Sequence, residues 1–311
     1  MDKNRISLSR AIDGYFIAAH ARRLSSHTLQ DYDTTFRKFQ QFLGQDPPLA
    51  SITAAEIRAF LNSLEGLSAK TLLNYHTGLS ALWTWAVKEE IVARHIVRDV
   101  QPPQPDKREI VPFSEHEVKA MLAACDRSRG YSRPGKRRCD NQRPTALRDR
   151  AIILLLVDTG LRASELCELR LRQVDLKSHQ VIVMGKGRKE RILPIAPRTA
   201  QTLWRYLATR DDTDRDTAYL FTTHAGSSIS RYSLRRLLSR IGQRAGVLDA
   251  HPHRFRHTFA ITFLRNGGNV FALQRILGHS SIEMVQRYLA IAQTDLQNAH
   301  HQASPVTNWL L

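Results

Sequence analysis

The segment HPHRFRHTF, His251–Phe259, predicts the start of a helix that carries cationic side chains on one face. His253 and Arg256 are three residues apart, so they point the same way from a helix, and donors at a helix start suit an anion. His253 and His257 are four apart, as zinc ligands on a helix would be. However, no H-E-x-x-H glutamate accompanies them, and the neighbouring basic residues would repel a divalent cation. The segment therefore favours an anion site over a metal site, and a structural role for His257 over a ligand role.

The segment LGHSSIEMVQRY, Leu277–Tyr288, adds a histidine and a tyrosine further along the chain. His279 comes directly after Gly278, and Tyr288 lies on what is predicted to be the next helix. A single tyrosine on a helix usually belongs to the core or to an interface. Tyr288 stands out because it follows, in chain order, a series of basic residues in three other segments.

The segment TGLRASEL, Thr159–Leu166, places an arginine just after a predicted helix end. Gly160 stops the helix, so Arg162 lies in a connection where its side chain can point into a cleft. Glu165 follows one helical turn later and can orient the guanidinium, although such a pair is also common on surfaces.

The segment GKGRKER, Gly185–Arg191, is predicted to be the tip of a β-hairpin. Lys186 lies between two glycines, with Arg188, Lys189 and Arg191 close behind, so a mobile cationic tip could reach a phosphate. By itself this signal is weak, because such tips are often only solvated. The segment also lacks the G-x-x-x-x-G-K-[ST] pattern of a nucleotide-binding loop.

Breaking a phosphodiester without a cofactor needs a nucleophile, cations around the non-bridging oxygens and an acid for the leaving oxygen. In chain order the four segments supply Arg, Lys, His-x-x-Arg, Leu-Gly-His and Tyr, and this pattern resembles the tyrosine recombinase, or phage integrase, family. The resemblance covers Val111–Ala292, and the helical region before it is similar to the core-binding domain of that family. Without an additional arm-binding domain, the chain is more similar to Xer-type and transposon-borne recombinases than to large phage integrases.

The resemblance implies a site-specific recombinase that cleaves and rejoins duplex DNA through a 3′-phosphotyrosyl intermediate, in integration, excision or resolution. Tyr288 would be the nucleophile, and the energy kept in its bond to the phosphate makes ATP and other cofactors unnecessary. The remaining catalytic positions would be Arg162, Lys186, His253, Arg256 and His279. The arginines would grip the phosphate, the histidines would add hydrogen bonds, and the lysine would protonate the leaving 5′ oxygen. Glu165 and His257 would support these residues.

The region before Val111 is predicted to be a separate helical domain. From Leu8 to about Ala93 the apolar residues recur at helical spacing, which fits four helices. The connection VQPPQPDKREIVP, 100–112, carries prolines and a charge cluster that disfavour a helix. The predicted domains are 1–104, a SAM-like core-binding domain, and 111–311, the catalytic domain with a C-terminal tail. By resemblance, the two would close around DNA as a C-shaped clamp.

The second domain is predicted to be mostly helical with a small β-sheet, which makes the fold α+β. Ser114 followed by Glu117 has the pattern of a capping box at a helix start. Predicted strands are Gln180–Met184 and Arg191–Ile195. Predicted helices are Leu147–Thr159, Ala163–Leu169, Arg198–Thr209, Tyr232–Arg244, Arg254–Arg265, Val270–Leu277 and Ile282–Ala292. The basic segment 128–145 has no periodicity and is predicted to be a loop, either solvated or facing DNA.

The net charge of +17, from 46 Lys and Arg against 29 Asp and Glu, favours a polyanionic partner. Because the basic residues are spread along the chain and not gathered beside an apolar helix, the expected partner is double-stranded DNA and not a membrane. Candidates for DNA contact are Lys70, Arg188, Lys189, Arg231 and Arg254.

The cysteines and the N-terminal sequence indicate where the protein works. Cys125, Cys139 and Cys167 are an odd number at wide spacing without a C-x-x-C pair, which is typical of a reduced, intracellular protein. The start MDKNRISLSR lacks the apolar stretch of a signal peptide, and the longest aliphatic run, Ala151–Val157, is too short to span a membrane. We therefore expect a cytoplasmic protein.

Three other functions remain open from the residues alone. They are a type IB topoisomerase-like enzyme, a catalytically silent DNA-binding factor and a metal-dependent nuclease, the last of which EDTA would inhibit. The compact helical N-terminal region argues against the first, and the filled catalytic positions argue against the second.

The apolar ending, Val306 and Trp309–Leu311, would either pack on its own domain or reach a neighbouring subunit. The resemblance implies the second, and with it a homo-tetramer on DNA that is closed through the C-terminal tail.

Overall fold

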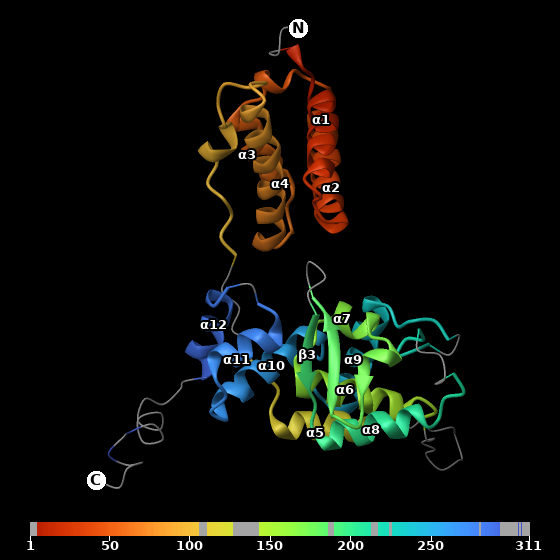
Figure 1. Ribbon diagram of the computed structural model, residues 1–311. Coiled ribbons are helices and arrows are strands. Elements are labelled where there is room, and N and C mark those ends of the chain that lie inside the picture. The colour runs from red at the N-terminus through yellow and green to blue at the C-terminus, as the bar shows by residue number, and fades with distance from the viewer. Residues whose placement is uncertain are drawn as a thin grey trace, which may run out of the picture. The chain divides into compact units, whose positions relative to one another are not determined.

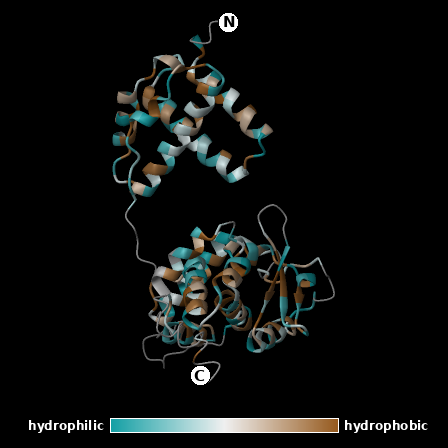
Figure 2. Cartoon of the chain, turned by 60° about the vertical axis from the view of Figure 1, so that its left-hand side comes forward, coloured by the Kyte–Doolittle hydropathy of each residue, from teal (hydrophilic) through white to brown (hydrophobic). Residues whose placement is uncertain are grey.

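The computed structural model describes residues 5–105, 111–126, 143–185, 190–212, 217–223, 226–279 and 281–292, together with 304 and 306. The chain divides into two compact units, Met1–Arg108 and Glu109–Leu311 (Figure 1). The division falls within the proline-rich connection 100–112. Each unit has a hydrophobic core of its own, and hydrophobic residues lie on the inward sides of its helices (Figure 2).

The first unit contains the four helices that the sequence predicts. They are α1 (Leu8–Ala21), α2 (Ser26–Leu43), α3 (Ala54–Ser63) and α4 (Ala69–Lys88), with short 3-10 turns at Leu49–Ser51 and Ile96–Asp99. Hydroxyl side chains begin three of these helices: Ser25 and Ser68 accept a backbone N–H at the starts of α2 and α4, and Thr53 forms a capping box with Glu56. Aromatic side chains such as Phe36, Phe39 and Trp83 fill the core between α2 and α4.

The second unit is mostly helical with one small sheet, as predicted. Its helices are α5 (Glu115–Ala124), α6 (Ala146–Thr159), α7 (Ala163–Glu168), α8 (Pro197–Leu207), α9 (Arg231–Ala245), α10 (Pro252–Arg265), α11 (Val270–Leu277) and α12 (Glu283–Ala292). The predicted capping box is present at the start of α5, where Ser114 accepts the Glu117 N–H and Glu117 accepts the Ser114 N–H. A 3-10 turn, Leu171–Gln173, leads from α7 into the sheet.

The sheet is antiparallel, in the order β1 (Val174–Asp175), β2 (Gln180–Met184) and β3 (Glu190–Pro194). The sequence predicts β2 with these bounds and β3 one residue later, but it does not predict the two-residue β1. In the β2–β3 register Val181 lies opposite Leu193, and Val183 lies opposite Arg191. Because alternate residues share a face, Arg191 lies on the same inward side of β3 as the buried Leu193.

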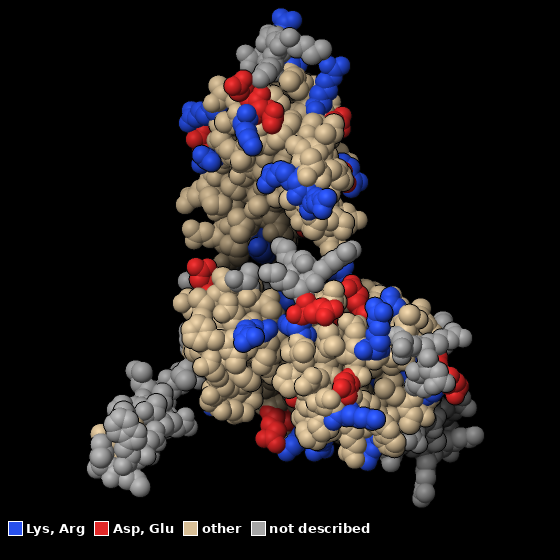
Figure 3. Space-filling view, in the orientation of Figure 1, with Lys and Arg blue, Asp and Glu red and all other residues tan. Residues whose placement is uncertain are grey.

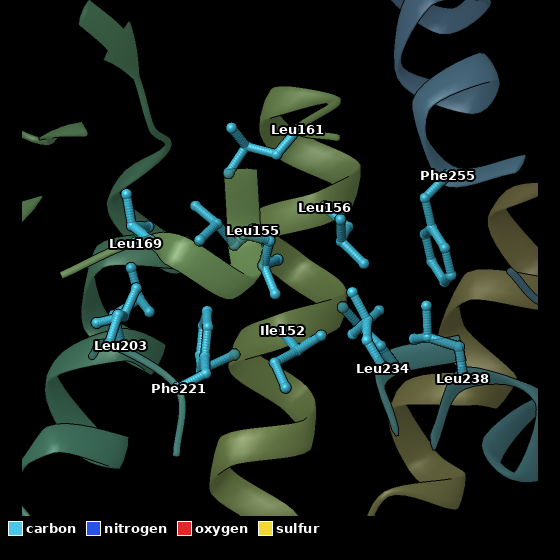
Figure 4. Close-up of a cluster of buried hydrophobic side chains, with 14 of the residues drawn as sticks. Ile152, Leu155, Leu156, Leu161, Leu169, Leu203, Phe221, Leu234, Leu238 and Phe255 are labelled. Carbon is cyan, nitrogen blue, oxygen red and sulfur yellow. The ribbon is translucent and has the colours of Figure 1, made fainter. Parts of the chain in front are cut away.

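Helix α6 forms the centre of this unit and packs against α8 and α10. Figure 4 shows its side chains Ile152, Leu155 and Leu156 surrounded by residues of α8, α9 and α10 and of the connections between helices. A smaller cluster joins α10, α11 and α12 and includes Tyr288. Because α6 is held by this packing, it fixes the connection that precedes it and the connection that follows it to α7.

Two further predictions bear on the surface of the chain. Of the loop predicted at 128–145, residues 128–142 lie outside the described residues, whereas Arg143 and Thr145 hydrogen bond to the buried Asp149 of α6. Within the described ranges, every helix is too short or too polar to cross a membrane.

Candidate active site

The connection from α6 to α7 brings Arg162 to the site. Gly160 ends α6 with a left-handed backbone, φ +62°, and donates its N–H to Leu156 O at 3.0 Å. A β-carbon at position 160 would come within 2.6 Å of the Phe259 ring, so the close approach of α10 also requires glycine. Arg162 then takes the position before the first residue of α7, as the sequence predicts.

Glu165 holds Arg162 in place. Its Oε2 accepts the Arg162 backbone N–H at 2.8 Å, and its Oε1 accepts Nη1 of the same residue at 3.0 Å. Arg162 Nη2 donates to Gly278 O at 3.2 Å, and about a third of the side chain remains exposed, at 33%. The guanidinium is thus oriented from one side and open on another.

Glu165 also binds a second arginine, Arg191 of β3. Arg191 donates Nη1 to Oε1 at 3.0 Å and Nη2 to Oε2 at 2.8 Å, a bidentate pair, and its Nε binds Ile276 O at 2.9 Å. Burial of Glu165 would raise its pKa, but the hydrogen bonds from Arg191 and Arg162 outweigh this and keep the pKa below its ordinary value. Glu165 is therefore a buried carboxylate that links α7 to β3.

Arg256 is the most deeply buried cation of the site, with 4% of the residue exposed. Its Nη1 donates to Gly160 O and its Nη2 to Leu277 O, both at 2.8 Å. These carbonyls lie at the C-terminal ends of α6 and α11, where the helix dipoles favour a positive charge. Burial and the nearby Arg162 lower the pKa of Arg256 to about 10, so its guanidinium remains charged at neutral pH.

His279 lies beside this guanidinium. Its Nε2 is 2.7 Å from Arg256 Nη2, and because arginine only donates, Nε2 must accept. Burial and the charges of Arg256 and Arg162 lower the pKa of His279 to about 4, so the ring is neutral and carries its proton on Nδ1. This Nδ1 is buried and has no hydrogen-bond partner among the residues that the structure describes.

His253 and Tyr288 complete the cluster. His253 is exposed on the first turn of α10, and desolvation of its ring together with Arg256 and Arg162 lowers its pKa. Tyr288 lies on α12 with 5% of the residue exposed, and its ring stacks on that of His279, with centroids 6.4 Å apart and an interplanar angle of 14°. The hydroxyl of Tyr288 lies 2.9 Å from Nδ1 of His257.

The structure thus brings together most of the site residues predicted from the sequence. Arg162, Glu165, His253, Arg256, His257, His279 and Tyr288 form one connected cluster. Lys186, Arg188 and Lys189 lie outside the described residues. Arg191 is the residue that sequence reasoning missed as part of the site, because it was read as part of a mobile cationic tip and is instead bound to Glu165.

The three other predicted DNA contacts, Lys70, Arg231 and Arg254, lie on α4, α9 and α10. Lys70 is exposed on the first turn of α4, and Arg231 is exposed as the first residue of α9. Arg254 is engaged within its own unit: it binds Leu248 O, Val111 O and Glu117 and lies 4.0 Å from the centroid of the Phe113 ring. These contacts attach the segment before α5 to α10, so Arg254 has a structural task whether or not it meets DNA.

The cluster has an excess of positive charge. Three guanidinium groups, Arg162, Arg191 and Arg256, surround one carboxylate, Glu165. The imidazoles of His253 and His279, both with a lowered pKa, and the phenol of Tyr288 lie beside them. An anion with several oxygens would find charge in Arg162 and Arg256 and a donor in His279 Nδ1. Elsewhere, Lys and Arg side chains are spread over the visible faces of both units and do not gather in one patch (Figure 3).

Comparison with protein families gives two adjacent matches. Residues 112–295 match the phage integrase family, and residues 12–90 match the N-terminal SAM-like domain of phage integrases.

Comparison with individual proteins gives relatives along nearly the whole chain. The tyrosine recombinase XerC of Staphylococcus saprophyticus is 30% identical over 91% of this chain and 93% of its own. XerC of Alcanivorax borkumensis is 31% identical over 92% of this chain and 91% of its own.

Solved structures share the fold. The XerA recombinase is 26% identical, with a TM-score of 0.51 over 96% of this chain and 99% of that one. The Tn1549 transposon integrase in complex with a circular intermediate DNA is 21% identical, with a TM-score of 0.74 over 94% and 98% of the two chains.

Proposed function

The chain belongs to the phage integrase family, and from this we propose that it is a Xer-like tyrosine recombinase, an enzyme that cuts and rejoins duplex DNA at specific sites. The observation that carries the proposal is the convergence of Arg162, Arg256 and His279 beside the hydroxyl-bearing Tyr288 within one unit. Such a cluster offers a nucleophile and a receptor for a phosphate in one place.

In the proposed reaction the scissile phosphate binds between Arg162 and Arg256. Both guanidiniums are held in fixed orientations, so they stabilise the charge that develops on the non-bridging oxygens without rearranging first. His279 donates its Nδ1–H, which has no partner within the described part of the chain, to one of these oxygens, and His253 adds a donor from the open side. Glu165 and Arg191 hold Arg162 from behind.

Tyr288 attacks the phosphorus, and the 5′ oxygen leaves. The product is a 3′-phosphotyrosyl bond, and rejoining is the reverse attack by a 5′-hydroxyl, so no nucleotide cofactor is consumed. We assign the protonation of the leaving oxygen to Lys186, on its position in the sequence between Arg162 and His253. We also propose that the enzyme works in the cytoplasm, and the support is that its proposed substrate is DNA.

The substitution Tyr288→Phe tests the proposal. It removes only the phenolic oxygen, so the variant should bind DNA like the wild type and give no protein–DNA adduct that resists SDS. The matched control is Tyr206→Phe, since Tyr206 is also 5% exposed but lies on α8, and this variant should form the adduct normally. Adduct at the wild-type level from Tyr288→Phe would refute the assignment.

We further propose that four copies assemble on DNA through the C-terminal tail. The support is the apolar ending of the sequence, which would be costly to expose, and the family's need to bring two DNA sites together. Truncation after His301 should leave monomer folding and single-site binding nearly intact and reduce paired-site complexes in native gels. Unchanged complexes would rule out a tail contact between subunits, and gross unfolding would favour local docking.

A further inference from the structure

Tyr288 is hydrogen bonded to a histidine outside the His-x-x-Arg and Leu-Gly-His patterns. His257 follows Arg256 on α10, and its Nδ1 lies 2.9 Å from the Tyr288 hydroxyl on α12, with ring centroids 5.6 Å apart. A separation of 2.9 Å is within direct proton-transfer range. The contact ties the proposed nucleophile to a group that can change its protonation state near neutral pH.

A base is needed here because phenol is a poor nucleophile in its neutral form. With an ordinary pKa near 10, only about one tyrosine in a thousand is ionised at pH 7. The positive cluster helps the phenolate, but the proton must still move to an acceptor as the bond to phosphorus forms.

The histidine nearest to Arg256 is unsuited to this task. The lone pair of His279 Nε2 already accepts from Arg256, and Nδ1 carries the proton, so the ring has no vacant acceptor. Its pKa of about 4 also makes it a weak proton acceptor. His279 is equipped to donate to the phosphate and to stack on the tyrosine ring.

We propose that His257 is the base that takes the phenolic proton of Tyr288 during cleavage. The inference rests on the proposed function and assigns His257 a direct part in it. As Oη bonds to phosphorus, its proton passes to Nδ1 of a neutral His257 whose own proton is on Nε2. The bond from phosphorus to the 5′ oxygen breaks, and that oxygen takes a proton from Lys186.

Rejoining reverses each transfer. The 5′-hydroxyl gives its proton to Lys186 and attacks phosphorus, the bond to Oη breaks, and Oη regains its proton from His257. The proton count is therefore the same before and after a complete cycle, which suits an enzyme that must run both directions with equal ease.

His257 lies among other titratable and charged groups. His253 shares its helix, with the ring centroids 6.5 Å apart, and Tyr288 faces it from α12. The charged groups that act on its neighbours His253, Arg256 and His279 are Arg162, Glu165, Arg191 and Arg235, together with Arg256 itself.

The test uses the full chain and a nicked duplex that traps the covalent intermediate, with single-turnover cleavage measured from pH 5 to pH 10. The wild-type rate should rise as His257 loses its proton and then level off near neutral pH. His257→Gln keeps a polar side chain of similar reach but cannot carry the proton. Its rate should fall about 100- to 10,000-fold at pH 7 and keep rising with pH towards the ionisation of the phenol.

Controls separate this role from a structural one. His116→Gln, an exposed histidine on α5, should leave the profile unchanged. Added imidazole should restore part of the rate to His257→Gly. A bridging sulfur in place of the 5′ oxygen removes the need for an acid, so the loss in His257→Gln should persist on that substrate. If instead the loss disappears, His257 serves the leaving group and the proposal is wrong.

The shape of the His257→Gln pH profile separates a base from a residue that only positions Tyr288. A His257→Gln profile that is lower but levels off near neutral pH, like the wild type, would mean that His257 only positions Tyr288. If His257→Gln does not fold, His257→Asn provides the same profile. Failure of the proposed function looks different, because the wild-type protein itself would then form no adduct at any pH.

Discussion

Glu165 is the residue on which the geometry of the site depends most. Its two carboxylate oxygens accept four hydrogen bonds, two from Arg162 and two from Arg191, while only 6% of its side chain is exposed. A buried ion pair adds little net stability, but removal of one partner leaves uncompensated charge. We therefore expect Glu165 to support cleavage by fixing the direction of the Arg162 side chain.

The substitution Glu165→Gln should reduce cleavage more than DNA binding. Loss of the charge leaves two arginines without their anion, so we expect about 3 kcal/mol less stability and, from the misplaced Arg162, a cleavage rate lower by about 100-fold. The matched control is Glu117→Gln, because Glu117 also caps a helix and binds an arginine, Arg254. Glu117→Gln should lower the stability by about 1 kcal/mol or less and leave the cleavage rate unchanged.

Chemical denaturation and single-turnover cleavage measure these effects. Equal losses of binding and cleavage in Glu165→Gln would mean that Arg162 acts as a simple phosphate anchor.

Arg191 shows which part of the site could be predicted from the sequence and which could not. The order of Arg162, Arg256, His279 and Tyr288 is visible along the chain, and so is the Arg162–Glu165 spacing. The Arg191–Glu165 pair joins residues 26 positions apart on different elements, which no local pattern reveals. One signal was present: Arg191 shares strand parity with the apolar Leu193 and Ile195, so it had to point inward.

At the scale of elements, the ends of helices α6 and α11 build the site. Both helices end at a left-handed glycine, Gly160 with φ +62° and Gly278 with φ +63°. Their last turns direct carbonyls at Arg256, and the Gly278 carbonyl accepts from Arg162. Two helix stops are thereby combined into one receptor for guanidinium groups.

The substitution Gly160→Ala should damage both stability and cleavage. The new methyl would meet the Phe259 ring at 2.6 Å and would also strain a left-handed backbone, for a loss of about 2–4 kcal/mol. Gly246→Ala is the control: Gly246 ends α9 with φ +69°, and a β-carbon there meets no atom within 4 Å. It should cost about 1 kcal/mol from backbone strain alone and leave cleavage intact.

Thermal unfolding and adduct formation would check both variants. If Gly160→Ala and Gly246→Ala lower the stability by the same amount, α10 packs on the end of α6 less closely than the structure indicates.

The same helix ends explain how well sequence patterns predict the elements. Gly160, Gly246 and Gly278 mark helix ends within a residue or so, and the Ser114–Glu117 capping box marks a start. Strand β1 was missed because two residues are too few for a period. Its pairing comes from the tertiary position of the turn after α7, which the local sequence does not encode.

At the scale of the whole molecule, the chain consists of two units with separate cores. The first unit closes its core between Leu8 and Val100, the first residue of the proline-rich connection. Its helices are capped by their own side chains. Nothing in its described core depends on residues of the second unit, so it meets the usual conditions for independent folding.

A fragment of residues 1–105 should therefore fold alone and bind DNA weakly. Its binding constant K should fall steeply as salt rises: in a plot of log K against log salt concentration, each phosphate contact adds about one to the downward slope. The full chain should show both a higher affinity and a steeper slope. Circular dichroism and titration at several salt concentrations would measure this. If the second unit alone keeps the full affinity and slope, the first unit contributes no phosphate contacts.

The backbone hydrogen bonds of Arg256 determine which mutations this site can tolerate. Its two fixed partners are peptide carbonyls of Gly160 and Leu277, and no codon change can delete a peptide carbonyl. Neighbouring residues can be substituted without loss of these two hydrogen bonds, provided that α6 and α11 still end at the same residues. The geometry at Arg256 then depends on a few positions that set the backbone, whereas Arg162, which binds Glu165 as well as the Gly278 carbonyl, loses its carboxylate partner through a single mutation in the codon for Glu165.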